Sequence, residues 1–238
     1  MMKINDLNIL YEDNHIIVVV KAANVLSQKD ITNDLDIMTM IKNYLKVKYQ
    51  KPGDAFLGLV HRLDRRVSGV MVFAKTSKAA SRLSENIREN KMKKEYLAFV
   101  QGITPKQGQM VDYLKKVSED SSSRAIISSK EDKDAKLSIL EYQTIKQLKI
   151  DEQDFSIVKV TLITGRYNQI RVQMASRGYP LINDFKYHYR GKNYDDELGL
   201  VCNKLVFPHP TLKEMMEFSY QPTEGVWSYL YKEDKNEK

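Results

Sequence analysis

The chain has 238 residues, 38 of them Lys or Arg and 31 Asp or Glu, which gives a net charge of +7; 42% of the residues are hydrophobic. A chain of this length buries roughly 70–75% of its unfolded surface, so it needs neither disulfides nor a structural metal to fold. Its single cysteine, Cys202, excludes an internal disulfide and a cysteine-rich metal site, and indicates a reducing compartment. No apolar run approaches the ~20 residues of a membrane span, and no signal-peptide core follows the first residues. We therefore expect a soluble, cytoplasmic protein.

The predicted elements alternate between helix and strand only in the first part of the chain. Apolar, β-branched runs predict strands at residues 16–20, 70–74, 95–100, 139–145, 155–163, 200–207 and 214–220. Helical spacing predicts one helix with Leu35, Met38, Ile41 and Leu45 on one face after a cap at 32–34, and a second with Ala80, Leu83 and Ile87 after Ser77. Residues 119–136 are rich in Ser and charge, which predicts an exposed hairpin or loop.

Strands outnumber helices in this pattern, so we expect an α+β fold with a large, mostly antiparallel sheet flanked by helices and loops. The sequence has no internal repeat, long linker or low-complexity tract. A single domain over residues 1–238 is therefore expected. The charged residues 232–238 predict a frayed tail.

The positive charge gathers in two stretches. Residues 61–96 carry ten basic and four acidic side chains, and residues 166–192 carry six basic and one acidic. Clustering of this kind is typical of a protein that binds a polyanion. A basic surface that only improves solubility accounts for the charge equally well.

The most informative local pattern is HRLDRRVSG at residues 61–69, where Asp64 stands among three arginines. Cations nearby favour the ionised form of an acid, so Asp64 is suited to act as a nucleophile or a base. On spacing alone, an ion pair that only fixes a loop is the more common explanation. The sequence lacks the P-loop, dinucleotide-binding and zinc-deaminase motifs, and its four histidines lack metal-ligand spacing.

This segment resembles the H-R-L-D-x-x-T-S-G motif of the RluA-type pseudouridine synthases, and further blocks follow in that family's order. Residues 10–21 are similar to the opening strand pair, 94–102 to K-x-Y-x-A-x-V-x-G, 164–173 to T-G-R-x-H-Q-I-R-V-H, and 178–187 to G-x-P-I-x-G-D-x-x-Y. The blocks cover most of the chain from about residue 9 to residue 210. The resemblance implies the pseudouridine synthase catalytic fold, with an active-site cleft across the sheet and no preceding S4-like domain.

The resemblance also implies an activity, the isomerisation of specific uridines to pseudouridine in ribosomal or transfer RNA, with no cofactor and no metal. By similarity Asp64 is the catalytic carboxylate, which either attacks C1′ or abstracts a ribose proton. Arg171 pairs with Asp64, and Tyr96 stacks on the detached uracil and serves proton transfer. Without the resemblance, Arg171 would be a phosphate contact on an exposed helix and Tyr96 an ordinary strand tyrosine.

A target uridine in folded RNA must leave its stack to enter such a site. Arg62 resembles the residue that displaces and replaces the flipped base in this family, and a phosphate clamp is the alternative. The candidate substrate-binding residues are Arg62, Lys93, Lys94, Arg166 and Lys186. Residues 185–190 interleave aromatic and basic side chains, which suits unpaired bases and phosphates; in an alternating strand they would instead be half core. We expect RNA as the partner, no membrane, no obligatory protein partner, and a monomer.

Several positions depart from the family pattern. Family K-P-x-G reads KAAN at 21–24, the motif threonine is Val67, and the two histidines of H-Q-I-R-V-H are Asn168 and Gln173. None of these changes removes a predicted catalytic residue, so we expect a divergent but active enzyme. Two alternatives stay open: a non-catalytic RNA-binding or ribosome-assembly factor that retains the fold, and an unrelated hydrolase, for which no second carboxylate motif is present.

Overall fold

The computed structural model describes residues 7–50, 52–119 and 122–232. The chain falls into two compact units, one made of Met1–Lys94 with Cys202–Gln221 and the other of Glu95–Val201 with Pro222–Lys238. Apart from Lys232, the tail predicted to fray lies outside the described residues. No helix among the described residues is long and apolar enough to cross a bilayer. That residues 1–238 behave as a single domain stays a prediction.

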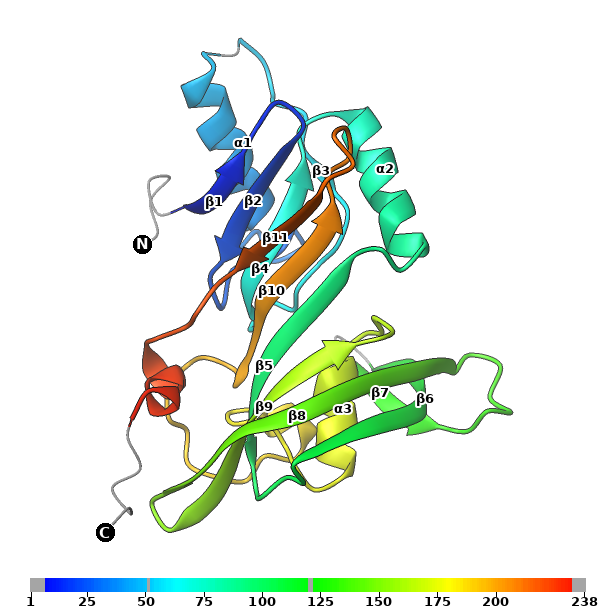
Figure 1. Cartoon of the computed structure of the whole chain (residues 1–238), viewed down its shortest axis with the longest axis vertical. Helices are drawn as coiled ribbons and strands as arrows, with labels where there is room; N and C mark the ends of the chain where they lie inside the picture. The colour runs from blue at the N-terminus through cyan, green and yellow to red at the C-terminus, as the bar shows by residue number, and fades with distance from the viewer. Residues whose placement is uncertain (1–6, 51, 120–121, 233–238) are drawn as a thin grey trace. The chain divides into compact units, whose positions relative to one another are not determined.

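The first unit is built on a sheet with the strand order β1-β2-β4-β10-β11, and β3 lies beside β4 (Figure 1). Its strands are β1 (Asn8–Glu12), β2 (Ile16–Lys21), β3 (Gly58–Leu59), β4 (Ser68–Ala74), β10 (Leu200–Pro208) and β11 (Met215–Ser219). The pairs β1–β2, β2–β4, β3–β4 and β10–β11 are antiparallel. Every residue of β2 and β4 is buried, which explains the apolar runs Ile16–Val20 and Val70–Ala74 within them. The strands predicted at 16–20 and 70–74 are thus confirmed.

Two helices belong to this unit, α1 (Ile37–Lys48) and α2 (Ser77–Arg88). The cap predicted at 32–34 is wrong, because Asp36 is the N-cap and accepts the Thr39 amide at 2.9 Å. A bridge between Leu26 and Asp36 keeps residue 36 extended, so the helix cannot begin earlier. Leu35 consequently lies outside the helix and is 42% exposed.

Helix α2 begins one residue away from the predicted cap. The hydroxyl of Thr76 accepts the Ala79 amide at 3.1 Å, and Ser77 is the first helical residue. Leu83 and Ala79 are buried among residues of β2, β4 and β10. The predicted helix is therefore confirmed, with its apolar face shifted toward Ala79.

Glu12 at the end of β1 fastens α1 to the sheet. Its carboxylate accepts hydrogen bonds from Lys48 and Lys75, both at 2.6 Å, and from the hydroxyls of Tyr44 at 2.9 Å and Tyr49 at 2.7 Å. The Glu12 side chain is only 7% exposed. Burial on its own would raise its pKa, but the hydrogen bonds from Lys48, Lys75 and the two tyrosines outweigh it and lower the pKa to about 2.

The second unit contains an antiparallel sheet with the order β5-β9-β8-β6-β7 (Figure 1). Its strands are β5 (Lys93–Gln101), of which the first two residues belong to the first unit, β6 (Gln107–Glu119), β7 (Ser122–Ser128), β8 (Lys136–Ile150) and β9 (Gln153–Leu162). Strands β6 and β7 form a hairpin whose connection at 120–121 lies outside the described residues. Residues 119–136, predicted as an exposed hairpin or loop, contain β7 and the turn that leads to β8, and Ala125 of β7 is buried. The antiparallel pairs and the few helices confirm the predicted α+β class.

One face of this second sheet is covered by α3 (Gln169–Ser176). Directly paired residues in neighbouring strands project from the same face, so Tyr96, Val160, Tyr142 and Gly108 share one face. Asp112 follows Gly108 at an even spacing, therefore lies on that face, and accepts a hydrogen bond from Gln173 of α3 at 2.6 Å. Helix α3 and Tyr96 thus lie on the same side of the sheet.

The described residues of the second unit also form two short 3₁₀ helices, η2 (Phe185–Tyr187) and η3 (Gly225–Leu230). The alternating strand considered for 185–190 is wrong. His188 has a φ of +69°, which ends η2 and is incompatible with an extended strand. Tyr187 and Tyr189 are buried, whereas Phe185 is 48% exposed.

Candidate active site

Asp64 lies in the loop between β3 and β4, at the start of a tight turn. Its carboxylate accepts the amide of Arg66 at 3.2 Å, and its carbonyl accepts the amide of Val67 at 3.1 Å. Asp64 is partly exposed, while Leu63 and Val67 are buried. The local sequence therefore anchors the loop through its apolar residues and leaves the carboxylate oriented by its own turn.

Two buried side chains from the rest of the first unit, Ser27 and Lys21, hold this loop in place. Ser27 donates to the Leu63 carbonyl at 2.7 Å and accepts the Leu63 amide at 3.1 Å. Lys21 is 0% exposed, and its ammonium donates to three backbone carbonyls, including that of Arg65 at 3.1 Å. Both contacts fall on residues that adjoin Asp64 in the chain. Ser27 and Lys21 are supporting residues that the sequence reasoning missed.

His61 at the start of the motif plays a structural part. Its Nε2 accepts the backbone amide of Val72 in β4 at 3.1 Å. Burial, and to a lesser extent the charge of Lys94, hold the pKa of His61 well below its usual value. A neutral imidazole can accept this hydrogen bond, so His61 attaches the first residue of the motif to β4.

The motif ends at Gly69, where the backbone requires glycine. Its φ is +132°, and a Cβ there would lie 2.3 Å from the carbonyl oxygen of Cys202 in β10. No other residue allows β4 and β10 to approach this closely. The glycine thus fixes the exit of the Asp64 loop.

Arg171 projects from α3 into a buried ion pair with Asp184. Its Nε lies 2.8 Å from Oδ2 and its Nη2 lies 2.7 Å from Oδ1, a bidentate arrangement. The guanidinium also lies 4.9 Å from the ring centre of Tyr187. The side chains of Arg171 and Asp184 are 6% and 0% exposed, so the alternative of a phosphate contact on an exposed helix is wrong.

Asp184 is a partner of Arg171 that the sequence reasoning missed, although it is the aspartate of the G-D-x-x-Y block. The pairing of Arg171 with Asp64 joins residues of different units and stays a prediction, as does the cleft across the sheet. Tyr96 is 6% exposed in β5 and lies on the face that carries α3. Tyr96 and Arg171 are therefore brought to the same side of one sheet.

Asn168 and Gln173, which replace the two histidines of T-G-R-x-H-Q-I-R-V-H, make structural contacts. Asn168, with a φ of +51°, donates to the hydroxyl of Tyr187 at 3.1 Å, and that hydroxyl also accepts the Ala125 amide at 2.7 Å. Gln173 is fully buried and donates to Asp112. These contacts hold α3 and η2 in the positions that join Arg171 to Asp184.

The predicted substrate-binding residues are divided between the two units. Arg62 and Lys93 are exposed in the first unit, where Lys94 is partly buried and burial lowers its pKa. In the second unit, exposed Arg166 donates to the Leu137 carbonyl at 3.0 Å and exposed Lys186 to the Ser123 carbonyl at 2.6 Å. Their roles toward RNA stay predictions.

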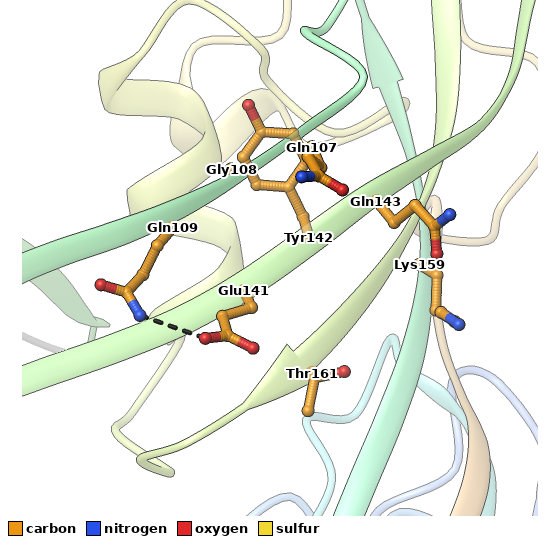
Figure 2. A pocket seen from close by; sticks show the side chains of 8 residues that line it. All are labelled: Gln107, Gly108, Gln109, Glu141, Tyr142, Gln143, Lys159 and Thr161. Atoms are coloured by element: carbon orange, nitrogen blue, oxygen red, sulfur yellow. Dashed lines mark hydrogen bonds between the residues drawn. The ribbon is translucent and has the colours of Figure 1, made fainter.

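Figure 2 shows a pocket of about 570 Å³ over the second sheet, in which Gln109 donates to Glu141 at 3.1 Å. The pocket is lined by Gln107, Gly108, Gln109, Glu141, Tyr142, Gln143, Lys159 and Thr161. Gly108, Tyr142 and Val160 share the face of Tyr96. The other six lining residues are their direct neighbours along the strands, and they therefore project from the opposite face. No predicted catalytic residue lines the pocket, and no group of three or more potential metal ligands occurs among the described residues.

Comparison with known proteins defines the class. A family model described as RNA pseudouridylate synthase matches residues 15–176. The solved structure of human RNA pseudouridylate synthase domain containing 1 has a TM-score of 0.74, with 22% identity over 94% of this chain and 86% of that one. Human RNA pseudouridylate synthase domain containing 4 has a TM-score of 0.72 at 20% identity. The protein has the fold of an RNA pseudouridylate synthase.

Two curated relatives narrow the assignment. Ribosomal large subunit pseudouridine synthase C of Buchnera aphidicola (subsp. Schizaphis graminum) is 31% identical over 88% of this chain and 65% of its own length. The dual-specificity RNA pseudouridine synthase RluA of Yersinia pestis is 31% identical over 88% of this chain and 96% of its own. The chain thus spans slightly less than two thirds of the Buchnera protein and nearly all of the Yersinia one. It belongs to the RluA-type RNA pseudouridine synthases.

Proposed function

We propose that this protein converts uridine to pseudouridine in RNA, with Asp64 as the catalytic carboxylate and large-subunit ribosomal RNA as the substrate. The observation that carries the proposal is the construction of the Asp64 loop. A partly exposed carboxylate is held by its own turn, while buried Ser27 and Lys21 fix the residues on either side of it. Such preorganisation suits a reacting group more than a surface ion pair. Relatives named for the large ribosomal subunit support the choice of RNA.

The reaction breaks the N1–C1′ bond of uridine, turns the uracil and forms a C5–C1′ bond. The proton lost from C5 is balanced by one gained at N1, so the product is an isomer and the step involves no oxidation. Asp64 either attacks C1′ and holds a covalent sugar adduct, or abstracts a ribose proton to give a glycal. Tyr96 stacks on the detached uracil, and its hydroxyl assists proton transfer. Arg171, held by Asp184, orients the Asp64 carboxylate.

The substrate uridine reaches Asp64 only when it is extruded from the folded RNA. Arg62, exposed and two residues from Asp64, is placed in sequence to take the position that the extruded base leaves. Lys93, Lys94, Arg166 and Lys186 contact the phosphates around it.

The test compares Asp64→Asn with Asp54→Asn, a matched change at an exposed carboxylate of the same unit. Total RNA labelled with tritium at C5 of uridine, from cells that lack the gene, releases tritium when pseudouridine forms. We expect Asp64→Asn to abolish release and to retain RNA binding, because the amide fills the same volume but cannot act as a nucleophile or a base. Release by this variant within about tenfold of wild type would remove Asp64 from the mechanism.

The same RNA identifies the substrate. Pseudouridines mapped in ribosomal and transfer RNA from cells with and without the gene should differ at positions in large-subunit ribosomal RNA. Differences confined to transfer RNA would overturn that choice and leave the activity intact. No difference, together with RNA binding and no tritium release, would favour a non-catalytic RNA-binding factor.

A further inference from the structure

Residues 27–35 form a compact loop in the first unit, between β2 and α1. Its base is closed because the Leu26 amide donates to the Leu35 carbonyl at 3.1 Å and the Ile37 amide donates to the Leu26 carbonyl at 2.9 Å. Loops whose ends meet in this way are frequently functional.

Both arms of the loop contact the segment that carries Asp64. On one side Ser27 exchanges hydrogen bonds with the backbone of Leu63, in a buried position. On the other, Asp34 forms an ion pair with Arg65 at 2.7 Å. The Asp34 and Arg65 side chains are each 44% exposed, so the ion pair is weak and Ser27 provides the firmer attachment. The loop is therefore attached to the neighbours of Asp64 on both sides.

The tip of the loop is an ordered turn that presents one apolar side chain to solvent. Asp30 accepts the amide and the hydroxyl of Thr32 at 2.9 and 2.6 Å, and the Thr32 hydroxyl accepts the Asp34 amide at 3.3 Å. Between these residues Ile31 is 97% exposed. Single exposed apolar residues are common on protein surfaces. Ile31 differs in that hydrogen bonds between Asp30 and Thr32 close an ordered turn around it.

The loop and the segment attached to it carry charges of both signs. Lys29 and Asp30 precede Ile31 and are exposed, Arg62 is exposed on the attached segment, and Arg65 is paired with Asp34. Proteins that unstack nucleic-acid bases combine positive charges, which neutralise phosphates, with an apolar wedge of the size of Ile or Leu. The exposed cations Lys29 and Arg62, together with the attachment of the loop to both neighbours of Asp64, favour a nucleobase over an apolar protein surface.

We propose that Ile31 packs against a base next to the target uridine and keeps the RNA open while the uridine occupies the site. This inference rests on the proposed function, because it assigns the loop to the substrate of Asp64. Ile31 acts as a binding residue that contacts RNA and takes no part in the bond changes.

A fluorescence experiment locates the contact. Ile31→Trp is compared with Val47→Trp, since Val47 is another β-branched residue of the first unit and is 71% exposed on α1. The natural Trp227 is 1% exposed and supplies the background, which is measured in the parent protein. On addition of total RNA from cells that lack the gene, we expect quenching at position 31 and none at 47, because a stacked base quenches indole fluorescence. Binding without quenching at position 31 would overturn the proposal and leave Ile31 for another partner, such as a protein.

A kinetic experiment measures the consequence. Ile31→Ala should lower kcat/KM for tritium release roughly tenfold, because a base packed on one side of Ile31 would cover about half of the apolar side chain that this change removes. Val47→Ala should leave kcat/KM unchanged. Because both side chains are exposed, both variants should melt at the wild-type temperature. Equal melting temperatures will show that the loss of kcat/KM does not come from unfolding. An unchanged kcat/KM for Ile31→Ala in an active enzyme would overturn this inference alone. Absence of tritium release by the wild-type protein would instead overturn the proposed function.

Discussion

Removing Asp184 should damage both the stability of the second unit and the proposed chemistry, because Asp184 is the buried partner of Arg171. The change to test is Asp184→Leu, which keeps the volume but leaves the guanidinium without its bidentate acceptor. Both side chains are almost inaccessible to solvent. Breaking a buried ion pair by removing one partner costs about 3–5 kcal/mol, because the remaining charge stays buried.

The free energy of unfolding is measured by urea denaturation, with the fluorescence of Trp227 reporting on the second unit. For a chain of this size each kcal/mol corresponds to about 2–4 °C in melting temperature, so a loss of about 6–20 °C is expected. Arg171→Leu should have a similar effect. The double variant Asp184→Leu with Arg171→Leu should lose less than the sum of the two, since it leaves no buried charge unpaired.

The matched control is Arg177→Leu, at the C-terminal end of α3. Arg177 lies 2.9 Å from Asp112, but its side chain is 33% exposed, so the pair should be worth at most about 1 kcal/mol. Tritium release should fall in Asp184→Leu and persist in Arg177→Leu, measured at a temperature where both are folded. If the Asp184 and Arg177 variants lose equal stability, the Arg171–Asp184 pair does not organise α3 as argued.

Three further predictions concern other parts of the molecule. Tyr96→Phe should bind RNA normally but turn over slowly in the tritium assay, since the ring still stacks and the hydroxyl is gone; unchanged turnover would limit Tyr96 to stacking. Lys93→Gln with Lys186→Gln should flatten the salt dependence of RNA affinity in filter binding by roughly one to two units, at about 0.7 per phosphate contact, and an identical slope would mean that these lysines face away from the RNA. Because folding lowers the pKa of Glu12 from 4.5 to about 2, its ionised carboxylate stabilises the fold at pH values above 4.5. The wild-type protein should therefore be more stable than Glu12→Gln by up to about 3 kcal/mol, and urea titrations should show this difference disappearing as the pH falls from about 4.5 to 2. A difference that does not change with pH would contradict the role of the ionised form.

The sequence predicted those features that depend on neighbouring residues. The runs Ile16–Val20 of β2 and Val70–Ala74 of β4 are apolar at every position because both faces of these strands are buried. Strand β8 was predicted too short, at 139–145 instead of Lys136–Ile150. Its later residues alternate between exposed and partly buried, and such polar strands in a long hairpin lack the apolar signal on which the prediction depended.

Features that depend on contacts between distant residues could not be predicted. Ser27 and Leu63 are 36 residues apart, and Lys21 and Arg65 are 44 apart. The bridge between Leu26 and Asp36 shifted the start of α1 for the same reason. In each case a tertiary contact decided the local structure, and a single sequence carries no signal for it. The partner of Arg171 was nearer, at 13 residues, but the family pattern had already assigned that arginine to Asp64.

The cost of burying Lys21 bears on the choice between an enzyme and a binding factor. A fully buried ammonium is expensive, and an apolar residue of similar volume would serve a purely structural position as well or better. In this protein the ammonium is held by three carbonyls, and one belongs to Arg65, the residue after Asp64. An RNA-binding factor needs its basic surface but has no use for an exact position of the Asp64 backbone. A reacting carboxylate does need it, because small displacements of the reacting groups slow the chemical step. The buried Lys21 therefore favours catalysis at Asp64 over RNA binding alone.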